Sequence, residues 1–159
     1  MMSVNTLSKA EQENLLLKKN AILCLVLGLF FVIDSTHELG GWELSGRWAL
    51  LYLPVLLLFF YMLYLLLNVS KFSRGVAKRA FWTGRFEDEY AEYLNARGYK
   101  FGYGVGFIGL ITFSLFADLI LADETTALIS MELWAQLAAA SMLIGYALPV
   151  IYGLAKDNE

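Results

Sequence analysis

The basic residues of this chain lie almost entirely on one side of four long apolar segments. Of the twelve Lys and Arg residues, only Arg47 lies beyond the opposite ends of these segments. The other eleven are Lys9, Lys18, Lys19, Lys71, Arg74, Lys78, Arg79, Arg85, Arg97, Lys100 and Lys156. Short loops rich in Lys and Arg remain in the cytoplasm when a membrane protein inserts. The pattern therefore predicts four transmembrane helices with both termini in the cytoplasm.

The composition agrees with a membrane protein. The chain of 159 residues is 58% hydrophobic, against about 45–50% in ordinary soluble domains. Its net charge of −3 hides an asymmetry, because acidic residues predominate on the side opposite the basic residues. Nucleic-acid binding is disfavoured, since acidic residues are interspersed with the cations of the basic loop. The expected fold class is an all-α membrane protein.

We expect a single membrane domain over residues 1–159. Its spans are predicted at about 20–34, 48–69, 101–121 and 131–154, as two hairpins around a cytoplasmic loop at 70–100. The first span rises only about 21 Å as a helix, less than the roughly 30 Å hydrocarbon core. It must therefore extend further or rely on flanking lysines that snorkel. No small-x-small cleavage site follows it, which favours a retained span over a signal peptide.

Two further segments are predicted to form short amphipathic helices on the cytoplasmic face. Residues 7–17 contain Ser8 and Glu11 at the spacing of a capping box. Residues 86–97 carry an apolar stripe at helical spacing and acidic residues on the opposite face. Each segment precedes a span that leaves the cytoplasm, which divides the chain into two parallel halves, each an interfacial helix followed by a hairpin. Duplication and coincidence both remain open as the cause.

Small residues at four-residue spacing mark the third and fourth spans. They predict close packing between these helices, because small side chains let two backbones approach each other. The residues expected at this contact are Gly102, Gly106, Gly109, Ser141 and Gly145. A self-association surface is the alternative. The Gly-x-Gly-x-Gly run at 102–106 does not indicate a dinucleotide site, because it begins a membrane span rather than following a strand.

Polar residues gather at the predicted outer ends of the spans. The candidates for binding a ligand or a proton are Asp34, His37, Glu38, Asp118, Glu132 and Gln136. Asp118 lies about 26 Å along the third span, and Gln136 is its expected hydrogen-bonding partner. The alternative is that these side chains are solvated at helix ends and in loops. No metal site is expected, because metal sites usually need three or four ligands and only one trio lies close together in sequence.

Neither a catalytic motif nor a cofactor site is expected. Cys24 is the lone cysteine, which excludes an intrachain disulfide and favours a buried, unreactive thiol. There is no HExxH motif, and the single histidine rules out a histidine pair. Phe81 and Trp82 are interpreted as membrane anchors rather than as part of a binding site. The loop is expected to contact lipid headgroups through Lys71, Arg74, Lys78, Arg79 and Arg85.

Three short motifs follow one another around the start of the third span. They are Asp88-Glu89-Tyr90, Asn95-Ala96-Arg97 and Gly102-Tyr103-Gly104, which together cover about fifteen residues. In this order they resemble a family of small uncharacterised four-span bacterial inner-membrane proteins. The resemblance implies a location in the bacterial cytoplasmic membrane and a role in a sensor or regulatory system. It implies no catalytic residue.

The expected function is that of a non-enzymatic integral membrane accessory or regulatory subunit. Its partners would be membrane lipids together with another protein or further copies of the chain. One alternative is a small oligomeric transporter or channel-like protein, since several copies could surround a pore that four spans cannot enclose. Another is a membrane enzyme or quinone-binding subunit that uses the outer acidic residues.

Overall fold

Helices form all the regular elements in the part of the chain that the structure describes. The computed structural model describes residues 8–40, 52–73, 78–121 and 131–156. Its elements, in chain order, are α1 (Lys9–Gly40), α2 (Tyr52–Ser70), the short 3-10 helix η3 (Lys71–Ser73), α3 (Lys78–Thr83), α4 (Glu89–Leu121) and α5 (Met131–Lys156). The prediction of an all-α fold is confirmed for these residues.

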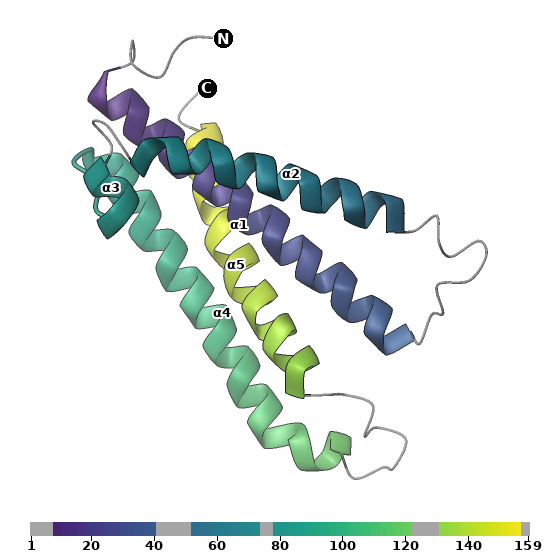
Figure 1. Ribbon diagram of the computed structural model, residues 1–159. Coiled ribbons are helices and arrows are strands. Elements are labelled where there is room, and N and C mark those ends of the chain that lie inside the picture. Colours follow the sequence, from purple (N-terminus) through teal and green to yellow (C-terminus); the bar gives the residue numbers. More distant parts are fainter. Residues whose placement is uncertain (1–7, 41–51, 74–77, 122–130, 157–159) are drawn as a thin grey trace.

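The four long helices form a bundle that is closed at one end and spread at the other (Figure 1). Helices α1 and α4 run away from the closed end, whereas α2 and α5 return to it. Helix α5 packs against both α1 and α4, while α2 packs mainly on α1. The first turn of α1, the last turn of α5 and the whole of α3 lie near the closed end.

Helices α1 and α4 are longer than the sequence predicts. From Lys9, helix α1 continues through the predicted amphipathic segment into the first span without a break, and α4 does the same from Glu89 into the third span. With 32 and 33 residues, they extend about 48 and 50 Å, well beyond a hydrocarbon core of roughly 30 Å. The prediction of separate short amphipathic helices is therefore wrong.

The junctions inside these two helices lack a signal that would end a helix. Lys18 is exposed, and the Lys19 ammonium lies 5.3 Å from the centre of the Phe72 ring, so the lysine pair is accommodated on a continuing helix. In α4, a Cβ on Gly98 would lie 2.7 Å from the Val150 side chain. The glycine therefore serves the packing of α4 on α5 rather than the termination of α4.

Buried apolar side chains gather toward the closed end. One cluster joins α1, α4 and α5 and consists of Leu17, Ala21, Ala91, Leu94, Tyr146 and Val150. A second cluster joins α1 to the end of α2, η3 and α3 and consists of Leu16, Val69, Phe72 and Ala80. Where water is the alternative environment, full burial of a leucine stabilises the fold by roughly 1.5–3 kcal/mol. These clusters explain why α1 and α4 remain helical beyond the predicted spans.

Three of the described helices are long and apolar enough to cross a membrane. Their candidate spans are Lys9–Ser35, Leu53–Ser73 and Leu133–Lys156, which correspond to the first, second and fourth predicted spans. The third predicted span, 101–121, forms the second half of α4 and is not among them. Most of its side chains beyond residue 112 lie outside those that the structure describes. The three helices indicate a membrane protein.

Capping side chains begin α1 and α4. The Glu11 backbone nitrogen donates to the Ser8 hydroxyl at 3.4 Å, and the Ser8 nitrogen donates to the Glu11 carboxylate at 2.8 Å, which confirms the predicted capping box. Before α4, the Asp88 carboxylate accepts a 2.8 Å hydrogen bond from the Ala91 nitrogen. Gly84 turns the chain between α3 and α4 with a φ of 65°, a conformation that glycine adopts without steric penalty.

Candidate functional site

A chain of hydrogen bonds crosses the closed end of the bundle. The Tyr146 hydroxyl of α5 donates to Asn95 Oδ1 of α4 at 2.8 Å, and the Asn95 amide nitrogen donates to the Gly84 carbonyl at 2.8 Å. The Asn20 amide nitrogen of α1 donates to the Tyr146 hydroxyl at 3.4 Å. Asn95 and Tyr146 are almost completely buried, so they satisfy each other's polar groups in place of solvent. The network fixes three long helices and the turn before α4 relative to one another.

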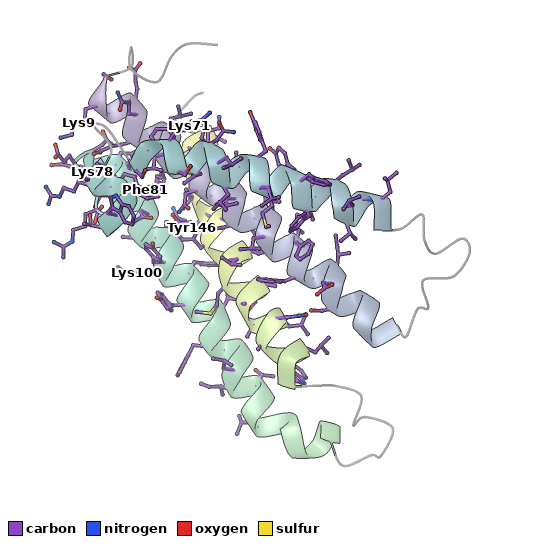
Figure 2. All side chains as sticks on the ribbon, in the orientation of Figure 1. Lys9, Lys71, Lys78, Phe81, Lys100 and Tyr146 are labelled. Atoms are coloured by element: carbon purple, nitrogen blue, oxygen red, sulfur yellow. The ribbon has the colours of Figure 1, made fainter. Side chains whose placement is uncertain are left out.

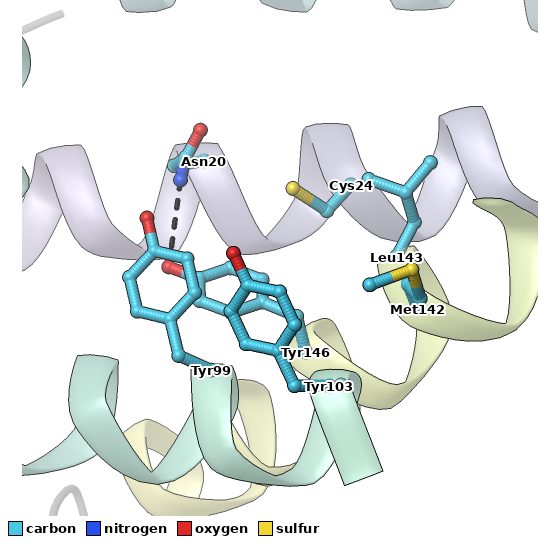
Figure 3. Close-up of a pocket in the computed structure, with 8 residues that line it drawn as sticks. Asn20, Cys24, Tyr99, Tyr103, Met142, Leu143 and Tyr146 are labelled. Atoms are coloured by element: carbon cyan, nitrogen blue, oxygen red, sulfur yellow. Dashed lines mark hydrogen bonds between the residues drawn. The ribbon is translucent and has the colours of Figure 1, made fainter. Parts of the chain in front are cut away.

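A row of tyrosine rings lies beside this network. Figure 3 shows Tyr99 and Tyr103 projecting from α4 toward α1, next to Tyr146 of α5. The ring centroids of Tyr99 and Tyr146 lie 5.0 Å apart, and those of Tyr99 and Tyr103 lie 6.3 Å apart. Tyr99 and Tyr103 are 45% and 64% exposed, so part of this row faces the surroundings of the bundle. The row forms one wall of a groove between α1 and α4.

Two adjoining cavities open along this groove. The smaller, of about 200 Å³, is lined by Asn20, Cys24, Tyr99, Gly102, Tyr103, Met142, Leu143 and Tyr146 (Figure 3). The larger, of about 380 Å³, lies toward α3 and is lined by Leu16, Asn20, Val69, Ala80, Phe81, Trp82, Thr83, Gly84, Phe86, Asn95 and Tyr99. Asn20 and Tyr99 line both cavities. The two spaces therefore form one site with two compartments, which we call the inner groove.

The inner groove carries polar groups but no charged ones. Among the described residues that line it, the polar groups are amides, hydroxyls, an indole and the Cys24 thiol, and none is an acid or a base that is charged at neutral pH. Such a lining can orient an uncharged molecule through hydrogen bonds, but it cannot compensate a buried charge. The chemistry of the groove therefore favours binding of an uncharged molecule.

Helix α4 packs closely on α5 beside the smaller cavity. A Cβ on Gly102 would lie 2.7 Å from the Met142 carbonyl oxygen, and a Cβ on Gly145 would lie 3.1 Å from the Gly102 Cα. These distances leave no room for a side chain at Gly102 without movement of the α5 backbone. The two glycines thus bring the helices into backbone contact.

The other residues expected at this contact are placed differently. Gly106 faces the flexible side chain of Met142 rather than the backbone of α5, and a Cβ on Gly109 would have no neighbour within 4 Å. The Ser141 hydroxyl donates to the Ala138 carbonyl of its own helix at 2.8 Å. The closest approach is therefore confined to the half of the α4 span that is nearer the closed end.

Glu13 of α1 holds the turn that precedes α4. Its Oε2 atom accepts hydrogen bonds from the backbone nitrogens of Glu87 and Asp88 at 2.9 and 3.0 Å. Glu13 is only 2% exposed, and the two donors compensate its burial. Nearby, Lys9 pairs with the Glu87 carboxylate and holds its pKa below the ordinary value of 4.5, first through the hydrogen bond and then through its charge. Both interactions hold the start of α1 against residues 87 and 88, which directly follow Phe86 in the lining of the larger cavity.

Basic side chains surround the closed end. Figure 2 shows Lys9, Lys71 and Lys78 together there, with Lys100 farther along α4. Of the residues predicted to contact lipid headgroups, Lys71, Lys78, Arg79 and Arg85 are exposed, and Arg74 lies outside the described residues. Lys71 also donates to Asn68 Oδ1 at 3.0 Å. The gathering of cations at one end agrees with the sequence pattern, and their contact with lipid stays a prediction.

The predicted outer cluster lies largely outside the described side chains. This applies to His37, Glu38, Asp118 and Glu132. Asp34 is exposed on α1, whereas Gln136 of α5 accepts a 3.1 Å hydrogen bond from the hydroxyl of Ser35, which is fully buried. Gln136 therefore links α5 to α1 on the spread side of the bundle. Its expected pairing with Asp118 stays a prediction.

Sequence reasoning missed the residues that organise the inner groove. Asn20 and Asn95 offered a signal, because an amide on the inward face of a long helix in a membrane bundle usually meets another polar group. Tyr146 offered another, because it lies in the middle of an apolar segment. Trp82, interpreted from the sequence as a membrane anchor, lines the larger cavity.

No protein-family model, curated protein or solved structure significantly matches this chain. The character of the site consequently follows from the geometry of the chain itself. That geometry defines a helical membrane protein with an uncharged, aromatic groove at the closed end of its bundle.

Proposed function

We propose that this chain is a non-enzymatic integral membrane accessory or regulatory subunit that acts through contacts with partner spans and lipids. In this proposal it crosses a bacterial cytoplasmic membrane four times, with both termini in the cytoplasm. The positive-inside distribution of Lys and Arg supports the orientation. The position of the first turn of α1 and the last turn of α5 at the same end of the bundle is consistent with an even number of spans (Figure 1).

The observation that carries the proposal is the large apolar surface left open on α2 and α4. On α2, Leu57, Phe60 and Leu67 are 61%, 57% and 66% exposed, and only the last part of the helix contributes to the buried clusters. On α4, Phe107 and Ile108 are each 65% exposed. In a membrane these faces meet lipid or the spans of another protein. The rest of the bundle does not cover these faces, so a partner span can reach them.

Helix α2 supports the same interpretation by its position. It packs mainly on α1 and lies at the edge of the bundle (Figure 1). A partner helix that packed on its free side would gain van der Waals contact with its side chains, one of the forces that drive helix association in membranes. The partner chemistry that fits is an apolar transmembrane helix.

Site-specific photo-cross-linking in native membranes tests this proposal. A benzophenone amino acid replaces Phe60 on α2 or Phe107 on α4, and the control replaces Phe72, which is buried inside the bundle. We expect discrete protein adducts from the two exposed positions and none from the control. Adducts at about twice the chain mass of 17.9 kDa would instead support the homo-oligomer that a small transporter requires. Lipid adducts alone at both positions would contradict the proposed contact with a partner span.

A further inference from the structure

The two compartments of the inner groove are arranged along the bundle axis. Cys24 follows Asn20 by four residues on α1, and Tyr103 follows Tyr99 by four residues on α4, so both helices carry the groove about 6 Å farther from the closed end. Helix α5 runs in the opposite direction, toward the closed end. Met142, which precedes Tyr146, therefore also lies farther from the closed end. The smaller, apolar compartment is therefore the deeper one in a membrane that the helices cross from the closed end.

The larger compartment has the features of a site for a flat, uncharged ring. Aromatic side chains of Phe81, Trp82, Phe86 and Tyr99 line it, together with the amides of Asn20 and Asn95. Each amide nitrogen donates one of its two hydrogens to a protein acceptor in the described part of the chain, which leaves the other for a ligand oxygen. Its volume of about 380 Å³ falls in the range of small-molecule sites.

We propose that the inner groove binds an isoprenoid quinone. The quinone ring lies in the larger compartment, where its carbonyl oxygens accept hydrogen bonds from the amides and from the Tyr99 hydroxyl. The isoprenoid chain lies in the smaller compartment against Cys24, Met142 and Leu143. The exposed edges of Tyr99 and Tyr103 leave the groove open at its side, so a lipid-soluble molecule enters from the bilayer.

Other membrane molecules match the groove less well. A phospholipid would place its charged headgroup on the exposed cations outside the groove, such as Arg85, because none of the described residues that line the groove carries a charge. Diacylglycerol shares the uncharged, hydrogen-bonding head, but it has no ring to lie against the aromatic walls. The site is separate from the outer acidic residues and from the apolar faces of α2 and α4. Quinone binding therefore goes beyond the proposed accessory role and can fail or succeed independently of it.

A fluorescence titration tests the assignment with the full-length chain in phosphatidylcholine nanodiscs. Decylubiquinone is the probe, and quenching of tryptophan emission is the signal, because Trp82 lines the larger compartment. We expect saturable quenching that Trp82→Phe largely removes. Quenching that rises linearly without saturation, or that is unchanged in Trp82→Phe, would overturn the proposal.

Two variants locate the binding site. Tyr99→Phe keeps the ring but removes the hydroxyl, and it should weaken quinone binding about three- to tenfold, as expected for the loss of one hydrogen bond. Tyr93→Phe is the matched control, because Tyr93 lies on the same helix, is 57% exposed and does not line the groove. Equal affinities of Tyr99→Phe and Tyr93→Phe would remove the proposed contact.

A competition experiment separates the quinone from other uncharged lipids. Dioctanoylglycerol is added to the decylubiquinone complex at increasing concentration, and recovery of Trp82 emission reports displacement. We expect little recovery at equimolar dioctanoylglycerol. Full recovery at equimolar dioctanoylglycerol would show that the groove recognises uncharged lipid heads in general, and the quinone assignment would be wrong.

Discussion

The hydroxyl of Tyr146 donates a 2.8 Å hydrogen bond to Oδ1 of Asn95, and this bond joins α5 to α4 across the interior of the bundle. Both residues are nearly buried, at 6% and 5% exposure. Neither group has water as an easy alternative partner, so the pair specifies how the two helices sit against each other. Asn95 also fixes the turn before α4, because its amide nitrogen donates a hydrogen bond to the Gly84 carbonyl.

Removal of the Tyr146 hydroxyl should therefore destabilise the bundle. Tyr146→Phe leaves the Asn95 amide oxygen buried without its donor, and we expect a loss of about 1–2 kcal/mol in the free energy of unfolding. Thermal or denaturant unfolding in mild detergent measures it. Tyr152→Phe is the control, because Tyr152 lies on the same helix and is 66% exposed. Identical stabilities of the two variants would show that the bond contributes nothing.

Glycines on α4 provide a matched pair with opposite expected signs. Gly102→Ala places a Cβ 2.7 Å from the Met142 carbonyl oxygen, so α4 and α5 must separate and the bundle should lose about 1–3 kcal/mol. Gly104→Ala meets nothing within 4 Å and should be neutral or stabilise the helix by up to about 1 kcal/mol. Unfolding of both variants in the same detergent provides the comparison. A Gly102→Ala variant as stable as Gly104→Ala contradicts backbone contact.

Gly106 should show an intermediate response. A leucine there displaces the Met142 side chain from its Cγ outward, which requires a change of rotamer, whereas no change of rotamer can move the carbonyl oxygen beside Gly102. Gly106→Leu should therefore destabilise the α4–α5 contact less than Gly102→Leu does. The same unfolding assay compares the two losses of stability. A larger loss in Gly106→Leu than in Gly102→Leu would show that the tighter contact lies at Gly106.

The sequence was sufficient to predict the helical class and the segments that became long apolar helices. Periodicity and composition report local preference, and the apolar runs at 48–69 and 131–154 have no competing interpretation. The sequence did not show that the helices predicted at 7–17 and 86–97 continue into the spans that follow them. This continuation depends on the packing of Leu17 in α1 and Leu94 in α4 against Val150 in α5. Tertiary packing, rather than a capping signal, decides those boundaries.

The inner groove was harder to predict because its residues come from helices far apart in the chain. Asn20 and Tyr146 are separated by 126 positions, and Tyr146 and Asn95 by 51 positions. Single polar residues in apolar segments show that a partner must exist but do not name it. Acidic residues and a histidine instead indicated a site at the opposite end of the bundle, since charged side chains stand out in an apolar sequence more clearly than amides and tyrosines.

The Glu13 carboxylate should be essential to the turn before α4. Glu13→Ala removes the acceptor of two backbone donors, those of Glu87 and Asp88, and should reduce the stability of the fold by about 2–3 kcal/mol. Glu13→Gln keeps one oxygen in place and should lose only about 1 kcal/mol. Hydrogen exchange at the two donor amides gives a direct measurement. Unchanged protection of these amides in Glu13→Ala would contradict the role of Glu13.

The ion pair of Lys9 and Glu87 predicts an acid-sensitive contact. The pKa of Glu87 in the folded protein lies below its ordinary value of 4.5, so its contribution is complete above that pH and is lost as the pH falls through the lowered pKa. Carboxyl chemical shifts of Glu87, followed by NMR from pH 6 to pH 2, should give a midpoint below 4.5. Lys9→Gln should raise the midpoint toward 4.5, and an unchanged midpoint would show that Lys9 is not the cause.

The eleven-to-one distribution of Lys and Arg predicts the orientation of the chain in the membrane. In a Cys24→Ala background, a cysteine at Thr126 should react with a membrane-impermeant maleimide in intact cells, because the loop between the third and fourth spans is predicted to lie outside. A cysteine at Gly75, in the predicted cytoplasmic loop, should react only after permeabilisation, which also serves as the control that the position is reactive. Labelling of Gly75→Cys in intact cells would reverse the proposed orientation and place the basic end, together with the inner groove, on the outer side.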